Sequence, residues 1–289
     1  SWNCRRPMNL IIASEADTAS INLRDRLLEM AEWEEDGEFD GKKIWHLSKD
    51  YGNFCLSGTR LITIKKLHIH AEGIDHKWVE ETGIDVKNIV FLSRHKAASG
   101  RPSLTVHPIG NWGKADYGGQ EGRVSGASPQ WMTGLLLNIY KNRLPGYDVC
   151  FEATHHGPLI DKPTMFLEIG SGEDQWELRE PAETLIRSLL ELEPAEGVTV
   201  VGIGGGHYTP RFTEAALSHM VCFGHMVANY GLPSLTPTLL DDAIKASDAK
   251  GLYFHKKGMK KSDYRKWKEY ADERRIRVFS QADYNKRDL

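Results

Sequence analysis

The chain has 289 residues, of which 40% are hydrophobic and 27% are charged. This length and apolar content suffice for one large or two modest packed cores and exclude a disordered or fibrous protein. No stretch approaches the roughly 18 apolar residues of a membrane helix, and the opening SWNCRRP lacks the apolar run of a signal peptide. We therefore expect a soluble, cytoplasmic protein that does not engage a membrane.

Short apolar runs alternate with amphipathic segments along the chain, which is typical of an α/β layered fold. Several of these runs are apolar throughout, as expected of strands that are covered on both faces. Nine strands are predicted, at residues 8–13, 59–64, 88–93, 104–107, 148–153, 164–169, 198–203, 251–255 and 275–279.

Capping residues and prolines mark the starts of helices between the strands. They predict four helices, which begin at Asp17 or Thr18, at Ser128 and Pro129, at Pro181, and at Thr209 and Pro210. We find no internal repeat or linker and predict one domain over residues 8–289, with residues 1–7 as an upstream addition before a natural start at Met8. The glycine-rich stretch 110–126 is interpreted as a long functional loop.

Five of the twelve histidines directly end apolar runs: His95, His107, His155, His156 and His207. If the strands are parallel, their carboxyl ends meet at one edge of the sheet and these side chains share a site. Glu152 and Glu168 lie close to the same run ends, and we expect Glu152 to reach the site only if the chain bends after Ala153. The other seven histidines are assigned structural roles.

Imidazole and carboxylate groups together suit zinc or a similar divalent cation. The four cysteines are far apart and form no CxxC pair, which fits a reducing compartment and argues against a thiolate zinc cage. A cation held by His and carboxylate groups lowers the pKa of bound water to about 7 and so favours hydrolysis of an ester or amide. No GxSxG nucleophile motif is present.

The C-terminal segment 250–289 is basic, whereas the rest of the chain is acidic. It carries 13 Lys and Arg against 6 Asp and Glu, a net charge of +7 against −10 for the first 249 residues. Aromatic residues are interleaved with these cations, a mixture that suits a nucleic acid with accessible bases. Composition alone favours the simpler interpretation, a solvated amphipathic helix followed by an edge strand.

Four groups of motifs carry a family resemblance: FLSRH with PSLTVHPIGNWG, FEATHHGP, FLEIGS with the following EDQW, and GIGGGHYTPRFTE. Together they resemble the D-aminoacyl-tRNA deacylases of archaea and plants, from about Met8 to the basic segment. The resemblance implies a zinc-dependent hydrolase that cleaves the ester between a D-amino acid and the 3′ end of tRNA. It also implies a three-layer α/β/α sandwich around a mixed, largely parallel sheet of the phosphorylase/hydrolase-like class.

Building on the resemblance and on the basic charge of the C-terminal segment, we assign roles to individual residues. One or two zinc ions are expected, with His95, His155, His207 and Glu152 as ligands, and proton transfer is assigned to His156, Glu168 and His107. Contacts to the tRNA acceptor end are assigned to Arg94, Lys96, Lys256, Lys257, Lys260, Lys261 and Arg265.

Two other functions remain open from the residues alone. A metal-dependent exopeptidase or amidase of related fold would use the same activated water without a nucleic acid. A non-catalytic RNA-binding protein would keep its histidines as structural residues and would tolerate their replacement.

Overall fold

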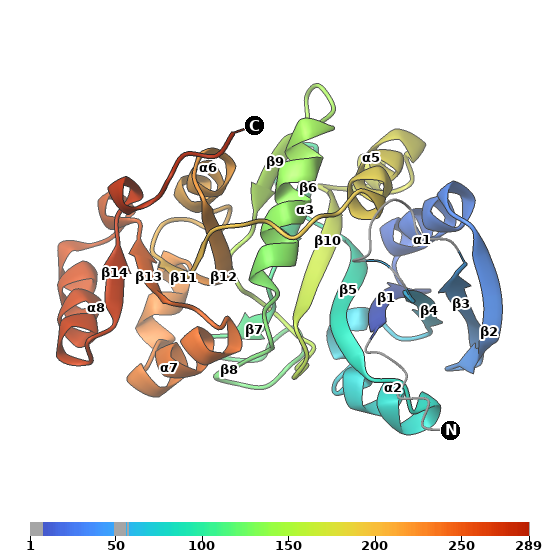
Figure 1. Cartoon of the computed structure of the whole chain (residues 1–289), viewed down its shortest axis with the longest axis horizontal. Helices are drawn as coiled ribbons and strands as arrows, with labels where there is room; N and C mark the ends of the chain where they lie inside the picture. Colours follow the sequence, from blue (N-terminus) through green and yellow to red (C-terminus); the bar gives the residue numbers. More distant parts are fainter. Residues whose placement is uncertain (1–7, 49–55, 57, 289) are drawn as a thin grey trace.

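The computed structural model describes residues 8–48, 56 and 58–288, which form two sheets side by side with helices on both faces (Figure 1). The larger sheet has eight strands, in the order β2 (Trp33–Phe39), β3 (Lys42–Leu47), β4 (Arg60–Ile64), β1 (Met8–Ser14), β5 (Val86–Arg94), β10 (Thr164–Gly170), β6 (Ser103–His107) and β9 (Asp148–Phe151). The smaller sheet has the order β12 (Val221–Val227), β11 (Val198–Ile203), β13 (Gly251–Phe254) and β14 (Arg277–Phe279). A short ladder joins β7 (Gly110–Asn111) and β8 (Arg123–Val124) within the glycine-rich stretch.

All nine predicted strands are present, with small shifts at their ends. Strands β2 and β3 were not predicted because β2 is mostly acidic and exposed and β3 begins with two lysines before a short apolar stretch. Strand β12, which is buried at every position, was also missed because Gly224 and His225 interrupt its apolar run. A side chain at position 224 would collide with Ser247, so glycine is required there.

The strand directions correct the expectation that the histidine-bearing strands are all parallel. Strands β4, β1, β5 and β10 run parallel to one another. Strand β6 runs antiparallel to β10, and β9 runs parallel to β6. His107, at the carboxyl end of β6, therefore lies opposite Phe166 in the middle of β10.

Helices α1 (Thr18–Met30), α3 (Pro129–Lys141) and α5 (Arg179–Leu190) cover one face of the larger sheet, and α2 (Ile74–Thr82) packs on the other. At the smaller sheet, α6 (Pro210–Ser218) packs on one face and both α7 (Pro237–Ala246) and α8 (Lys261–Glu273) on the other. The short helix α4 (Glu173–Trp176) follows β10. The predicted α/β architecture, a mixed and mostly parallel sheet between helices, is confirmed, as are the four predicted helices; Asp17 caps α1 by accepting from Ser20 N at 3.0 Å.

The hydrophobic core alternates with strand periodicity. Ile11 and Val90 face α1 and its neighbours, whereas Leu10 and Phe91 face Trp78 of α2. The first of these clusters continues without a break into the smaller sheet beneath α3. Each sheet face thus buries its apolar side chains against a helix layer, which is the main stabilising contribution to such a fold.

The two sheets meet where the chain leaves β9. Ala153 N donates to His207 O at 2.7 Å, and Thr154 N donates to Met226 O at 3.0 Å. Residues that follow strands of both sheets are thereby brought to one seam. Of the cysteines in the described part of the chain, Cys150 and Cys222 are free, whereas Cys4 and Cys55 lie outside it. None of the helices that the structure describes combines the length and apolarity that spanning a bilayer demands.

Candidate metal and catalytic site

The seam between the sheets gathers every residue predicted to bind metal or transfer protons. His95 follows β5, Glu168 lies on β10 and His107 ends β6. The segment after β9 supplies Glu152, His155 and His156, and the loop after β11 supplies His207. The predicted convergence is therefore present, although it arises from neighbouring antiparallel strands and a second sheet.

Glu152 lies at the centre of the site and is fully buried. Its Oε1 atom is 2.9 Å from His207 Nε2, 3.2 Å from His95 Nδ1 and 3.7 Å from His155 Nε2. Its other oxygen accepts a hydrogen bond of 2.7 Å from Thr105 Oγ1, so both oxygens are held in place. Strand β9 ends at Phe151, and Glu152 is therefore already free of the pleat that constrains strand side chains.

Three imidazoles are oriented by backbone carbonyls of their own loops. The Nδ1 atoms of His107, His155 and His156 lie 2.8, 2.7 and 2.6 Å from the carbonyl oxygens of Pro108, Ala153 and Gly157, respectively. A carbonyl can only accept, so each Nδ1 carries the proton and each Nε2 keeps its lone pair. Metal-binding histidines are typically oriented in this way.

The Nε2 atom of His107 is buried without a hydrogen-bond partner. It lies 3.0 Å from Glu168 Oε1, but the two atoms are not aligned for a hydrogen bond. A buried polar atom that lacks a partner costs free energy, which a bound cation would remove.

The donor atoms form two adjoining sets that share His155. One set is His107, His155 and His156, and the other is Glu152, His155 and His207; within each set the donor atoms lie within 4.8 Å of one another. Three of the four predicted ligands form the second set, and the fourth, His95, groups with Glu152 and Glu168. His107 and His156, which the resemblance assigned to proton transfer, are thus placed equally well to hold a cation.

Burial keeps three of these imidazoles neutral. Loss of solvation lowers the pKa of His156 to about 3 and that of His155 well below its usual range, and neighbouring imidazoles add to both shifts. Burial also lowers the pKa of His107. Neutral imidazole is the form that binds a metal ion.

The pKa values of the two buried carboxyl groups are shifted in opposite directions. Burial favours the neutral form of both, but His107, His207 and His95 outweigh it at Glu152 and lower its pKa well below the ordinary value. At Glu168, burial and the neighbouring Glu152 together raise the pKa well above the ordinary value. Glu152 is therefore ionised at neutral pH, whereas Glu168 is shifted toward its protonated form.

His95 is the imidazole that favours the charged form. Burial lowers its pKa, but the hydrogen bond and the negative charge of Glu152 outweigh this and leave the pKa raised. Its Nε2 atom lies 2.9 Å from the hydroxyl of Tyr208. His95 therefore links the buried carboxylate to a side chain at the mouth of the site.

Several residues that surround the histidines were not identified from the sequence. His68, assigned a structural role, lines the cleft with its Nε2 3.0 Å from Asp17 Oδ2. Asp17 also accepts from Arg94 N at 2.9 Å and so connects the start of α1 to the end of β5. The hydroxyl of Tyr230 lies 2.7 Å from His207 Nδ1. Tyr230 follows β12, the strand that was not predicted, so no pattern placed it at the site.

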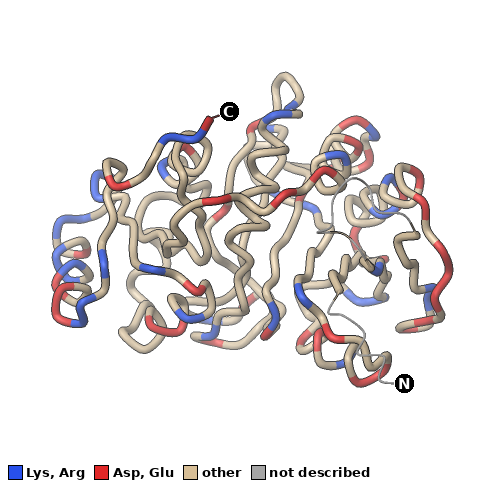
Figure 2. The backbone as a smooth tube through the Cα atoms, in the orientation of Figure 1, with Lys and Arg blue, Asp and Glu red and all other residues tan. Residues whose placement is uncertain are grey.

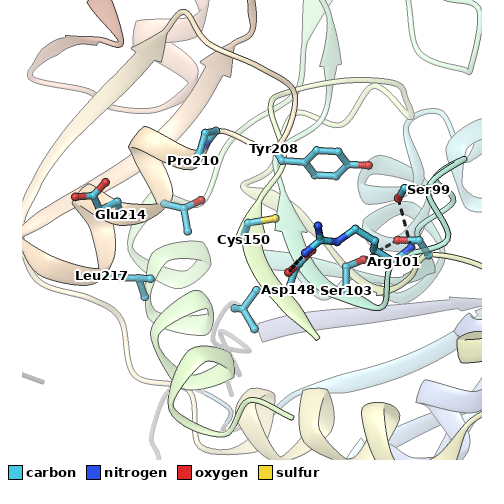
Figure 3. Close-up of a pocket in the computed structure, with 12 residues that line it drawn as sticks. Ser99, Arg101, Ser103, Asp148, Cys150, Tyr208, Pro210, Glu214 and Leu217 are labelled. Atoms are coloured by element: carbon cyan, nitrogen blue, oxygen red, sulfur yellow. Dashed lines mark hydrogen bonds and ion pairs between the residues drawn. The ribbon is translucent and has the colours of Figure 1, made fainter. Parts of the chain in front are cut away.

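Three cavities adjoin the cluster. The histidine cleft, of about 410 Å³, is lined by His95, His155, His156, His207 and Glu168 together with Arg94 and Lys96, so both predicted phosphate contacts lie beside the histidines. A second cleft of about 490 Å³ lies on the other side of His155 and His156. A third cavity of about 520 Å³, between β9 and α6, shares Tyr208 with the histidine cleft (Figure 3).

The basic segment lies on the smaller sheet (Figure 2). Lys256 and Lys257 occupy a 3₁₀ turn (Lys256–Gly258), and Lys260, Lys261 and Arg265 lie at the start of α8. Asn229 connects the turn to the glycine loop before His207, because its Nδ2 donates to Gly258 O at 2.6 Å and its Oδ1 accepts from Gly205 N at 3.1 Å.

The aromatic residues of this segment are largely internal. Tyr253, Phe254 and Trp267 are 3%, 9% and 1% exposed and pack in the core of the smaller sheet. The amphipathic helix and edge strand favoured by composition are confirmed as α8 and β14. These three buried rings are therefore unavailable to stack on bases.

Comparisons with known proteins agree with this arrangement. A protein-family model described as D-aminoacyl-tRNA deacylase matches residues 82–279. A protein of that description from Archaeoglobus fulgidus is 38% identical over 261 residues, which are 87% of this chain and 88% of that protein. One from Arabidopsis thaliana is 36% identical over 256 residues, which are 80% of this chain and 78% of that protein.

Two further comparisons define the extent of the match. A D-aminoacyl-tRNA deacylase from Methanococcoides burtonii is 35% identical over 280 residues, which are 95% of this chain but only 57% of that longer protein. A crystal structure of AF0625, described as a conserved protein of unknown function, has a TM-score of 0.87 and 33% identity, with 98% of this chain and 99% of that chain covered. The likeness therefore extends over both sheets and the seam between them.

Proposed function

Because the chain belongs to the D-aminoacyl-tRNA deacylase family, we propose that it hydrolyses the ester that joins a D-amino acid to the 3′ end of tRNA. Water adds its hydroxyl to the acyl carbon, the ester C–O bond breaks, and the departing ribose oxygen takes up a proton. The products are a free D-amino acid and an uncharged tRNA, and their release prevents the D-residue from entering translation.

The observation that carries this proposal is the convergence of five imidazoles and two carboxyl groups at one seam, in the histidine cleft or buried directly beside it. Burying this many polar groups without function would destabilise the protein. The buried Nε2 of His107 and the two donor sets that share His155 suit a divalent cation, and we infer one or two zinc ions. When bound, zinc supplies a Lewis acid and lowers the pKa of a water molecule to about 7.

The residues of the chain itself divide the remaining work. Ionised Glu152 orients His95 through a contact of 3.2 Å with its Nδ1 atom. Glu168 lines the cleft, and its raised pKa suits it to give a proton to the departing ribose oxygen. Arg94 and Lys96, which line the same cleft, are placed to hold the phosphates next to the ester.

The decisive experiment uses one tRNA charged separately with D-tyrosine and L-tyrosine. Chelator-treated protein and the same protein with zinc restored are incubated with each, and loss of the ester is followed. We expect the D-form to be lost much faster, only with zinc present, and with inhibition by free tRNA. An equal or faster loss of the L-form contradicts the specificity, and undiminished activity in protein shown by elemental analysis to be metal-free contradicts the metal site.

A further inference from the structure

Exposed tyrosines surround the mouth of the histidine cleft. Among the described residues, four large apolar or aromatic side chains stand out as exposed, and three of them are Tyr117, Tyr208 and Tyr230, at 69%, 41% and 57%. Tyr117 and Tyr208 line the histidine cleft, and Tyr117 and Tyr230 line the cleft on the other side of His155 and His156. Exposed aromatic surface concentrated at one place marks a binding site.

Two of these rings are fixed by their hydroxyl groups. Tyr208 reaches His95 Nε2 at 2.9 Å, and Tyr230 reaches His207 Nδ1 at 2.7 Å. The Tyr230 ring also stacks on the His207 ring, with centroids 5.8 Å apart and an interplanar angle of 28°. Each ring is therefore anchored at its polar end while more than two-fifths of the residue stays open to solvent.

The third tyrosine is fixed through its backbone. Gly157 N donates to Tyr117 O at 3.1 Å, which ties the residue to the loop that carries His155 and His156. The next residue, Gly118, has φ +80°, and a side chain there would collide with the carbonyl of Ile69. The glycine allows the close packing that holds Tyr117 beside the histidines, whereas its ring remains uncovered.

Cations accompany the rings. Lys96 lies in the histidine cleft, and Lys114 lies in the cleft that holds Tyr117 and Tyr230. Both lysines are exposed, and Asp116 is an acidic residue that lines the second cleft. Aromatic faces combined with lysines are the features by which proteins bind unpaired nucleotides, since every base has a face that can stack and every nucleotide carries a phosphate.

Tyr208 has additional space beside it. It forms one wall of the third cavity, with Val149, Cys150 and Leu217 as its apolar lining and Ser103 and Ser171 as hydroxyl groups (Figure 3). A volume of about 520 Å³ is typical of small-molecule sites. One base can therefore enter an apolar enclosure beside this ring.

We propose that Tyr117, Tyr208 and Tyr230 bind the unpaired 3′ nucleotides of the substrate by stacking on their bases, with Lys96 and Lys114 beside the phosphates. The inference rests on the proposed function and names the part of tRNA that these residues hold. The amino acid differs between substrates, but the strand that carries it does not, so these rings position the ester through the constant part of the molecule.

The test is a cycle of two changes, one in the protein and one in the ligand. The dissociation constant is measured for uncharged tRNA and for the same tRNA without its last three nucleotides, with wild type, Tyr117→Ala and Tyr117→Phe. Stacking contributes about 1–3 kcal/mol per base, so we expect Tyr117→Ala to weaken binding of intact tRNA about 5- to 150-fold. Tyr117→Phe keeps the ring and should stay within about twofold, and Tyr117→Ala should leave binding of shortened tRNA unchanged.

Leu178, the remaining exposed large apolar residue of the four, provides a matched control, because Leu178→Ala removes exposed apolar surface away from these clefts. An equal loss by Tyr117→Ala on intact and shortened tRNA, or no loss on either, overturns the stacking role. Deacylation by wild type is measured in parallel. If wild type deacylates the substrate but Tyr117→Ala weakens intact and shortened tRNA alike, the proposed function stands and the stacking role fails. If Tyr117→Ala weakens only intact tRNA but wild type does not deacylate, the stacking role stands and the proposed function fails.

Discussion

The histidine cleft and the basic C-terminal segment place their polar groups in opposite environments. At the cleft and directly beneath it, Glu152, Glu168 and His107 are at most 2% exposed, and ionisable groups face one another at 2.9–3.9 Å. In the segment, the lysines are in water and the rings of Tyr253 and Trp267 form the core. Burying charge is costly and exposing it is not. The geometry of the cleft is therefore itself evidence of function. For the basic segment, only a binding measurement can show whether its lysines have a function.

The largest effect should come from the shared ligand. His155→Ala removes a donor from both sets, and we expect deacylation to fall by about 10³-fold or more. Elemental analysis should show less zinc bound to the variant than to wild type. The variant should remain folded, which a measurement of its free energy of unfolding checks. His46→Ala, on β3 far from the cleft, is the control and should keep wild-type activity. If His155→Ala bound as much zinc and deacylated as fast as wild type, the buried groups of the cleft would be no better evidence of function than the exposed lysines of the basic segment.

A smaller effect concerns the pH dependence of stability near the cleft. Burial lowers the pKa of His225 to about 4, and its ring bonds Thr154 Oγ1 at 3.0 Å and Ser125 O at 2.7 Å in the neutral form. In the unfolded chain the imidazole of His225 is protonated near pH 6.5. The stability that neutral His225 contributes to the folded protein is therefore complete above pH 6.5 and is lost as the pH falls toward 4. The loss amounts to about 3 kcal/mol.

Denaturant unfolding of wild type and His225→Gln between pH 7 and pH 4 measures this contribution. The variant should be less stable at pH 7 but should lose about 3 kcal/mol less on acidification. Parallel curves for the two proteins would show that His225 does not contribute to the acid sensitivity.

The smallest effect is expected for the basic segment. Replacing four of its exposed lysines by Gln should weaken tRNA binding by about tenfold at low salt. The slope of log Kd against log salt should fall by about 0.7–0.9 for each phosphate that is no longer neutralised. The rate at saturating tRNA should not change. The lysines are Lys256, Lys257, Lys260 and Lys261.

A charge-matched variant controls for net charge alone. It replaces four lysines on β3, α2 and β5 of the larger sheet and its helix layer, Lys42, Lys43, Lys77 and Lys87. An identical salt slope in both variants would mean that the basic segment only contributes to solubility.

The sequence predicted that the histidines share a site because they end apolar runs. The shared site is present, but the assumption that their strands are all parallel was wrong. His95 and His107 follow strands of opposite direction, and they meet because β6 pairs with the middle of β10. Periodicity identifies a strand and its end, but it contains no information about which neighbour the strand pairs with. The convergence could therefore be predicted, while its topology could not.

Other features of the site depend on contacts that only the folded chain forms. The carbonyls of Pro108 and Gly157 determine which ring nitrogens of His107 and His156 keep their lone pairs. The spacing of histidines in the sequence therefore does not tell which of them are placed to bind a metal and which to transfer a proton. Tyr230 follows a strand whose apolar run is broken by Gly224 and His225. Exposure, which singles out Tyr117, is a property of packing and is absent from the sequence pattern.

The two donor sets differ in how they depend on chain connectivity. His107, His155 and His156 all belong to the part of the chain that builds the larger sheet, whereas the set with Glu152 and His155 is completed only by His207 from the smaller sheet. An ion in the second set would connect the larger sheet to the smaller one. By mass action such an ion would stabilise the contact between the two sheets by an amount that grows with the logarithm of its concentration relative to its dissociation constant.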